Sequence, residues 1–506
     1  MLFNSFEFIF VFLPVTLLVF WRIGGIGHHR AAIAWLVGAS LFFYAWWSPA
    51  YLGLILASML FNYAVGVALG SRPHKGLLVF GVTANLALLG YYKYANFFAS
   101  TVSDLGGLNW HLEHIVLPLA ISFFTFQQIA YLVDAWKGEA REYSFLHYCL
   151  FVVFFPQLIA GPIVHHREML PQFAQPNVYR MNHGFLALGL SIFTIGLFKK
   201  VVLADNLAPY ASEAFAAVAR GTPLTFFEAW RGTLAYSFQL YFDFSGYSDM
   251  AIGLAAMFGI RLPLNFASPY KATSIIEFWK RWHMTLSRFL RDYLYFPLGG
   301  NRKGPVRRYL NLLLTMVLGG LWHGAAWTFV AWGTLHGIFL IINHAWRALR
   351  KRLGWSGDSA LGDWTARVLT FLCVALAWVF FRAADFDSAM RMMQGLFGLN
   401  GFVWPGSGAE FGIVGLWLFD MGIQFADTDY FKGGRDVLIM GLLLTFVWRA
   451  PNTQEFMADH LAPGTDKTPP TIRWRPTRAW AMLLSGAALF SVLRLSQVSE
   501  FLYFQF

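Results

Sequence analysis

Apolar stretches long enough to cross a lipid bilayer recur along this chain, and no other feature restricts its fold as much. A membrane-spanning helix needs about 17 to 25 predominantly apolar residues. Charged residues make up only 13% of the chain, against roughly 25% in an ordinary soluble domain. The sequence therefore predicts an all-α, multi-pass membrane helix bundle. The apolar stretches lie at 6–21, 31–47, 51–69, 77–98, 115–135, 184–204, 366–381, 436–449 and 478–495.

The predicted bundle is a single integral membrane domain, with roughly eleven spanning helices. Between 146 and 345 the apolar stretches are interrupted by Pro, Gly and charged residues, which indicates re-entrant segments beside the spans. Polar groups at membrane depth concentrate in the middle of the chain, so we expect the chemistry there. The predicted parts of the 1–506 domain are scaffold spans at 1–114, a catalytic core at 115–345, further spans at 346–495 and a tail at 496–506.

One helix is predicted to lie along a surface rather than to cross the membrane. In the segment DFDSAMRMMQGLFG (385–398), four large apolar side chains recur at helical spacing among polar ones. Such a one-sided apolar stripe is typical of an interfacial helix. The four side chains are Phe386, Met390, Met393 and Phe397.

Basic residues predict the orientation of the bundle and exclude one class of partner. The net charge is +11, but the Lys and Arg residues are spread through short loops, which argues against nucleic-acid binding. Alternate connections hold basic residues, whereas those at 48–50 and 99–114 hold none, so we expect the amino terminus outside and the basic loops in the cytoplasm. The basic connections hold Arg22 and Arg30, then Arg72 and Lys75, then Lys137 and Arg141.

The two cysteines, Cys149 and Cys373, both lie in apolar stretches without a CxxC or Cys/His spacing. Neither a disulfide framework nor a metal site is predicted.

The segment GGLWHGAAWTFVAWGTLHG (319–337) places two histidines in a stretch otherwise suited to lipid. An ionisable residue at membrane depth is expected to face a cavity or a partner. His323 and His336 are thirteen positions apart and would not converge on one continuous helix. We favour His323 as a general base, because Gly and Ala neighbours admit a substrate and Trp322 and Trp327 wall the site. A histidine that only bonds across helices is the alternative, and it is favoured for His336.

A third histidine falls in FWKRWHMTLSRFLRDYLYFPLGG, where apolar side chains recur at helical spacing. His283 lies within that stripe, four positions after Trp279 and three before Leu286. Basic residues gather on another side of the predicted helix. They could lie against anionic lipid headgroups or bind the phosphates of an acyl carrier. These residues are Lys280, Arg281, Arg288 and Arg291.

The segment YFDFSGYSDM adds Asp243, Ser245 and Asp249 at membrane depth. Carboxylates are costly there, so we expect them to line an aqueous cavity or to pair with a buried Arg. A Ser-His-Asp hydrolase triad has the right residue types, but no GxSxG motif accompanies Ser245.

Two of these segments together resemble the signature region of the membrane-bound O-acyltransferase (MBOAT) family. They are FWKRWHMTLSRFLRDYLYFPLGGNR and LGGLWHGAAWTFVAWGTLHG, and FFPQLIAGPIVHHREMLPQF resembles the segment that precedes them. The opening SFEFIFVFLPVTLLVFW and the overall length are most similar to the bacterial branch that acetylates polysaccharides.

The resemblance implies a function and a role for each matched position. His323 corresponds to the catalytic histidine of the WHG motif, and His283 to a second polar position that orients or polarises the donor thioester. The implied donor is cytoplasmic acetyl-CoA, bound by the basic residues named above and by Trp322. Asp243, Ser245 and Asp249 would line the acceptor path. No permanently bound cofactor is implied.

The carboxyl-terminal FLYFQF resembles an aromatic motif of this branch, and also the tail of a partner peptide in teichoic-acid D-alanylation. That likeness implies Tyr503 as an acyl carrier, since an aryl ester is more reactive than an alkyl ester. The alternative is an interfacial aromatic anchor. The basic linker at 450–477 predicts that the tail faces outward.

The sequence thus predicts an O-acetyltransferase of a bacterial inner membrane that works with periplasmic acetyltransferase or polysaccharide-modifying proteins. Alginate is the first expected acceptor, with cellulose and peptidoglycan as alternatives. A polysaccharide or solute transporter, and a scaffold that only recruits secreted enzymes, are the alternatives from other classes.

Overall fold

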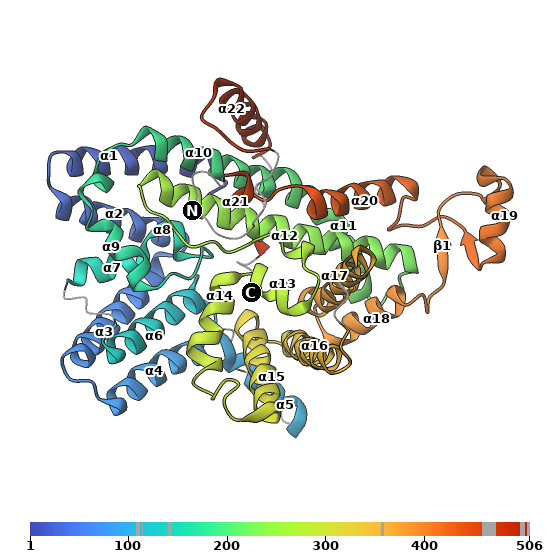
Figure 1. The fold of residues 1–506 in the computed structure, drawn as a ribbon, viewed down its shortest axis with the longest axis horizontal. Helices are drawn as coiled ribbons and strands as arrows, with labels where there is room; N and C mark the ends of the chain where they lie inside the picture. The colour runs from blue at the N-terminus through green and yellow to red at the C-terminus, as the bar shows by residue number, and fades with distance from the viewer. Residues whose placement is uncertain are drawn as a thin grey trace.

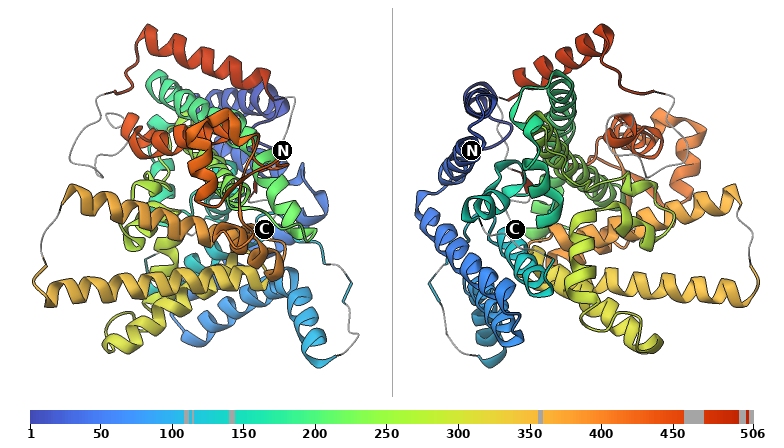
Figure 2. Two further views of the ribbon diagram at one scale, coloured as in Figure 1. Left: turned by 90° about the vertical axis from the view of Figure 1, so that its right-hand side faces the viewer. Right: turned by 60° about the vertical axis from the view of Figure 1, so that its left-hand side comes forward.

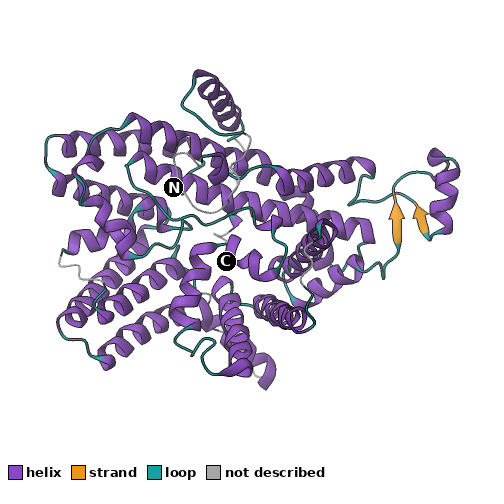
Figure 3. Ribbon diagram, viewed as in Figure 1, coloured by secondary structure: helices purple, strands orange, loops and turns teal. Residues whose placement is uncertain are grey.

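The structure is a computed structural model that describes residues 1–107, 112–113, 115–139, 144–355, 359–457, 472–495 and 501–502. Almost all of the regular structure is helical (Figures 1 and 3), as predicted. The first part of the chain contains α1 (Leu13–Gly25), α2 (His29–Ala45), α3 (Leu52–Ser71), α4 (Lys75–Leu89), α5 (Ala95–Gly106), α6 (Ile121–Lys137), α7 (Phe145–Val153), α8 (Phe155–Leu158) and α9 (His166–Phe173).

The second part contains the longest helices and the histidines singled out above. Its helices are α10 (His183–Phe198), α11 (Asp205–Ala219), α12 (Phe226–Met257), α13 (Ile275–Arg281), α14 (Met284–Leu290), α15 (Gly304–His323), α16 (Trp327–Arg352), α17 (Ala360–Arg382), α18 (Phe386–Leu396), α19 (Ile413–Asp420), α20 (Gly434–Arg449), α21 (Thr453–Phe456) and α22 (Arg478–Leu493).

Short turns join or interrupt these helices. Four are π-helical: η1 (Phe8–Phe12), η3 (Gly90–Tyr94), η5 (Lys199–Ala204) and η7 (Arg291–Tyr295). Four are 3₁₀ turns: η2 (Pro49–Tyr51), η4 (Pro176–Tyr179), η6 (Pro269–Lys271) and η8 (Gly408–Phe411). In long helices such π-helical turns are frequently found at functional sites.

Among the described residues, five helices are long and apolar enough to cross a membrane. This is fewer than the roughly eleven spans predicted from the apolar stretches. Part of the difference lies in α12 and α16, which are long enough but carry polar residues, and part in apolar helices that are shorter, such as α22 (Arg478–Leu493). The five are Phe8–Gly25, Pro49–Ser71, Lys75–Gly106, His183–Ala219 and Ala360–Arg382.

Helix α12 runs through the middle of the bundle (Figure 1) and belongs to two hydrophobic cores. Its first half, up to Phe244, packs with α11, α13 and α17. Its second half, from Tyr247, packs with the N-terminal helices. The boundary between two apolar cores is a place where polar groups can gather without being isolated in hydrocarbon.

Close packing of α10 against α12 depends on two glycines in each helix, seven residues apart: Gly189 and Gly196 on α10, and Gly246 and Gly253 on α12. A Cβ added to Gly189 would lie 2.5 Å from the backbone oxygen of Gly253, and one added to Gly196 would lie 2.5 Å from that of Gly246. Small residues let helix backbones approach in this way inside membranes.

Two peripheral features lie near the C-terminal part of the bundle. The predicted surface helix is α18, and three of its predicted stripe residues, Phe386, Met390 and Phe397, are exposed. Asp385 accepts a hydrogen bond from the Ser388 backbone at the start of α18, which lowers the pKa of its carboxyl.

Beyond α18, the parallel strands β1 (Phe402–Trp404) and β2 (Ile423–Phe425) project with α19 (Figure 1). Helix α22 lies across the outside of the bundle (Figure 2).

Candidate active site

The predicted signature segment folds as two helices joined by a sharp break. Helix α15 ends at His323, Gly324 is extended (φ −157°, ψ 147°), and α16 begins at Trp327. His323 and His336 therefore do not lie on one continuous helix, as the spacing argument assumed. His323 stands at the C-terminal end of α15, whereas His336 lies inside α16.

Aromatic rings surround the buried imidazole of His323. Its ring centroid lies 5.0 Å from that of Trp322, 5.1 Å from Trp332 and 5.2 Å from Phe381. Trp322 was expected as one wall, but Trp327, the other expected wall, is 56% exposed. Trp332 takes that place, because the break before α16 turns Trp327 away from the site.

His283 is brought next to His323 by a second interruption that the periodicity did not predict. The expected continuous helix ends at Arg281, and His283 adopts a left-handed conformation (φ 43°, ψ 54°) before α14 begins. A non-glycine residue in this region is uncommon and is often associated with function. The two imidazole centroids are 6.4 Å apart.

Asn265 fixes the position of His283 from outside the two short helices. Its side-chain oxygen lies 3.0 Å from His283 Nδ1 and also accepts from the hydroxyl of Thr285 at 2.9 Å. Its side-chain nitrogen donates to Ser248 on α12 at 3.1 Å. Because the amide oxygen can only accept, Nδ1 of His283 carries the hydrogen, and Nε2 of the neutral ring is an acceptor. This favours an orienting role for His283 over polarisation of a carbonyl by donation.

His336 lies on the other side of Trp332, whose ring centroid is 4.9 Å from that of His336 and 5.1 Å from that of His323. The indole nitrogen of Trp279 donates to its Nδ1 at 3.3 Å, and the ring of Phe278 stacks at 6.0 Å. Its side chain is fully buried. These contacts fit the structural role that was favoured for His336.

Lys93 and Tyr94, which the sequence analysis did not single out, satisfy the end of the histidine helix. The amino group of Lys93 donates to the backbone oxygens of Trp322 at 2.6 Å and His323 at 3.2 Å, and the hydroxyl of Tyr94 donates to that of Leu321 at 2.7 Å. The remaining oxygen of the last turn, that of Gly320, accepts from Gly324. All four carbonyls that a helix end leaves unpaired are thus bonded. The available signal was a lone Lys inside the apolar stretch 77–98.

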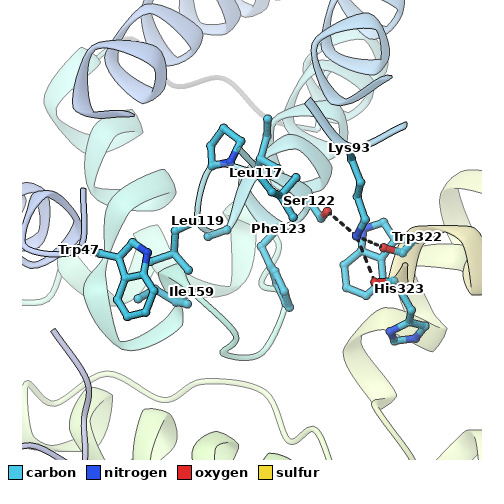
Figure 4. A pocket seen from close by; sticks show the side chains of 12 residues that line it. Trp47, Lys93, Leu117, Leu119, Ser122, Phe123, Ile159, Trp322 and His323 are labelled. Atoms are coloured by element: carbon cyan, nitrogen blue, oxygen red, sulfur yellow. Dashed lines mark hydrogen bonds between the residues drawn. The ribbon is translucent and has the colours of Figure 1, made fainter. Parts of the chain in front are cut away.

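A cavity of about 90 Å³ reaches His323 (Figure 4) and is lined mainly by residues 117–123, which follow the connection at 99–114. Lys93 points into its wall and also bonds to Ser122 at 3.3 Å. The other lining residues include Trp47, Leu117, Leu119, Phe123, Ile159 and Trp322.

A second cavity, of about 730 Å³, lies on the side of the basic residues and reaches Met284 and Thr285, next to His283. Of the five residues predicted to bind the donor, Lys280, Arg288 and Arg291 line it, together with Arg308. Arg288 is paired with Glu168 at 2.5 and 2.9 Å.

The other two predicted donor-binding residues are not in this cavity. Arg281 pairs with Glu277 at 2.9 Å and donates to the backbone of Ala267 at 3.0 Å. Trp322 lines the smaller cavity instead.

The three residues predicted for the acceptor path lie on α12 and are buried. Asp243 pairs with Lys200 and Asp249 with Lys199, each at 2.6 Å, so their partners are lysines rather than the predicted arginine. Within the described lining of the two cavities, none of the three residues occurs.

The predicted acyl carrier, Tyr503, lies outside the described residues. The neighbouring Phe501 and Leu502 are buried in the core. In the described part of the chain, no group of three His, Cys, Asp or Glu side chains could hold a metal ion.

Comparison with known proteins identifies similar chains. Residues 137–381 match the MBOAT, membrane-bound O-acyltransferase family. A peptidoglycan O-acetyltransferase of Helicobacter pylori is 47% identical over 79% of this chain and 80% of the relative. A probable alginate O-acetylase, AlgI, of Pseudomonas aeruginosa is 38% identical over the full length of both chains. A teichoic acid D-alanyltransferase of Bacillus subtilis is 28% identical over 54% of this chain and 71% of the relative.

Proposed function

This chain belongs to the membrane-bound O-acyltransferase family and is an O-acyltransferase, and from that premise we propose that it transfers acetyl groups from cytoplasmic acetyl-CoA to an exported polysaccharide. The helix bundle is a multi-pass membrane protein, which fits an enzyme that links the two sides of a bacterial inner membrane. The alternatives of a transporter and of a non-catalytic scaffold are no longer favoured, because both assumed that the protein transfers no acyl group.

The observation that carries this proposal is the position of His323 and His283 between two cavities. The larger cavity is lined by four Lys and Arg residues. Apart from Lys93 and His323, the smaller one is lined by apolar residues and Ser122, mainly from 117–123, next to the connection at 99–114. By the positive-inside rule the first opens to the cytoplasm and the second to the outside. The thioester can then enter from one side and the acceptor from the other, and they meet at the two imidazoles.

His323 is the general base in this mechanism. The acceptor oxygen attacks the thioester carbonyl carbon while His323 takes the hydroxyl proton. The C–S bond then breaks, and the proton passes to sulfur, so that CoA leaves as the free thiol. The hydrogen bonds from Lys93 and Tyr94 to the C-terminal end of α15 form a cap that fixes the backbone of His323. Positioning of this kind contributes a large part of the rate enhancement by enzymes.

His283 positions the reacting groups. Its Nδ1 is committed to Asn265, so its Nε2 can accept a hydrogen bond from the acceptor hydroxyl or from an amide of the donor. Its left-handed backbone turns the ring toward His323, which a continuous helix would not do.

The donor phosphates bind in the basic cavity. Lys280 and Arg308 are the cations that would face them, since Arg288 is already neutralised by Glu168 and Arg291 by Asp292. Charged hydrogen bonds to phosphate are strong and directional.

Tyr503 is proposed as an acetyl carrier: its phenol would be the hydroxyl that attacks the thioester beside His323, and the resulting acetyl ester would be collected by an outer partner. Support comes from Phe501 and Leu502, which bring the tail into the core. Periplasmic acetyltransferase or polysaccharide-modifying proteins would then collect the acetyl group.

Alginate is the first candidate acceptor, supported by a probable alginate O-acetylase that aligns over its full length. Peptidoglycan is the second, supported by the 47% identity to a peptidoglycan O-acetyltransferase. Cellulose remains an alternative by the same chemistry.

The test uses membranes that contain the wild-type protein, supplied with labelled acetyl-CoA on the cytoplasmic side and either alginate or peptidoglycan fragments outside. Label on one glycan and not the other identifies the acceptor. Loss of that label in Tyr503→Phe supports the carrier, and unchanged label rules the carrier out. Label on neither glycan, with the secreted partners present, would contradict the proposed acceptor class.

A further inference from the structure

Two consecutive lysines in the π-helical turn η5 pair with two carboxylates on α12. Lys199 bonds to Asp249 at 2.6 Å, and Lys200 bonds to Asp243 at 2.6 Å and to Asp205 at 2.9 Å. The side chains of Lys200 and Asp243 are only 2% and 3% exposed. A buried cluster of this kind is tolerated only when further hydrogen bonds satisfy its remaining polar atoms.

The C-terminal tail supplies one of those hydrogen bonds. The backbone N–H of Leu502 donates to the second oxygen of Asp243 at 3.0 Å. The amino group of Lys200 lies 4.7 Å from the ring centroid of Phe501, in the arrangement of a cation–π contact. Phe501 also meets the ring of Tyr247 edge-on at 4.5 Å.

The docked tail and the active site contact neighbouring residues of α12. Phe244, the neighbour of Asp243 on α12, contacts the imidazole of His283 edge-on with centroids 4.7 Å apart. Because successive helical residues point about 100° apart, Asp243 faces the tail while Phe244 faces the histidine. The same turn of α12 therefore holds both.

We propose that Asp243 and Lys200 form a docking site for the protein's own C-terminal tail, with Asp243 as the positioning residue that fixes the register of Phe501 and Leu502 against α12. A slip of one residue would remove the N–H from the carboxylate and the ring from the ammonium together. The docking contacts are independent of the proposed function. A part of the docked tail in acetyl transfer, by contrast, rests on the proposed function.

The other lysine pair provides a matched control. Asp249 accepts from Lys199 and from the hydroxyl of Thr453 at 2.6 Å, and Gln454 donates to it at 3.2 Å. It has the same charge, helix and burial as Asp243, but it holds α21 rather than the tail.

Hydrogen–deuterium exchange of the full-length protein in detergent tests the docking site. In Asp243→Leu the peptide that contains Leu502 should exchange about tenfold faster or more, because its acceptor is lost. Asp249→Leu should accelerate the peptide around Thr453 and leave the tail peptide unchanged. Equal tail exchange in wild type and Asp243→Leu would overturn the proposal.

Because Asp243→Leu could disturb α12 itself, a second test changes the tail instead. Leu502→Pro removes the donating N–H, whereas Leu502→Ala keeps it. We expect faster exchange of the tail peptide in Leu502→Pro only, and equal exchange in both variants would count against the docking site.

A third variant separates this proposal from the proposed function. His323→Ala should leave tail exchange at the wild-type rate even though acetyl transfer is lost. If Asp243→Leu instead lost transfer while its tail stayed protected, the docking site would be wrong and the acetyltransferase assignment would stand.

Discussion

The amino group of Lys93 donates a hydrogen bond to the backbone oxygen of His323 at 3.2 Å, although the two residues are 230 positions apart in sequence. It also donates to the backbone oxygen of Trp322 at 2.6 Å. The contact joins the scaffold part of the chain to the end of α15. It makes the position of the proposed base depend on a π-helical turn in the N-terminal part. The scaffold spans therefore help to build the site.

Lys93→Met should lower the turnover number about tenfold to hundredfold with little change in KM, because a small displacement of a base is costly. Thiol release from acetyl-CoA measures both constants. Tyr94→Phe is the matched control, since its lost bond is to Leu321, two residues before the histidine. We expect a smaller loss there. Wild-type turnover in a folded Lys93→Met protein would show that the cap does not position His323.

Asn265 should govern turnover through His283. Asn265→Leu removes the acceptor of His283 Nδ1 and of Thr285, and we expect it to lower turnover and to destabilise the protein by about 1–3 kcal/mol. Asn265→Asp keeps an acceptor oxygen and should retain more activity. The comparison uses turnover at a fixed acetyl-CoA concentration and thermal unfolding. Equal turnover in the two variants would argue against an orienting role for His283.

The basic cavity should recognise the nucleotide part of the donor. Arg308→Ala and Lys280→Ala should each raise KM for acetyl-CoA about tenfold, since one charge-assisted bond is worth roughly 1.5–3 kcal/mol. Acetylpantetheine lacks the nucleotide phosphates, so its KM should stay unchanged in these variants. Arg281→Ala is the control, because Arg281 is bonded to Glu277 outside the cavity. Equal effects on both donors would place the nucleotide elsewhere.

The α10–α12 contact should tolerate no added methyl group. Gly196→Ala would bring a Cβ against the backbone of Gly246, and we expect a loss of about 1–3 kcal/mol from overpacking. Gly486→Ala on α22 meets no atom within 4 Å and should be neutral or slightly stabilising. Thermal unfolding in detergent compares the two. Unchanged stability of Gly196→Ala would mean that the helices can separate at no cost.

Composition and apolar runs were enough to predict the all-α membrane bundle and the position of α18. The number of spans was not, because α12 combines apolar core residues with carboxylates that pair with lysines of another segment, so its sequence does not read as one apolar run. The break at His283 was also missed. The segment from 275 to 290 holds no Gly or Pro, so its periodicity favoured one helix, while Asn265, from outside the segment, stabilises the interrupted form.

The structure brings His283 and His323 close together and places three of the five predicted donor-binding residues in one cavity. The resemblance to a family directed attention to His323 and His283, whereas the residues that hold them, Lys93 and Asn265, carry no local motif. The lysine partners of Asp243 and Asp249 were missed for the same reason, since an ion pair between distant helices leaves no spacing in the sequence. Tertiary partners of this kind become visible only in the fold.

Release of free thiol from acetyl-CoA by the purified protein tests the central claim most directly, with wild type, His323→Ala and His336→Ala compared at matched thermal stability. The account predicts turnover in wild type, a loss of about 10² to 10⁴ in His323→Ala, and a much smaller change in His336→Ala. Wild-type thiol release by His323→Ala would contradict it.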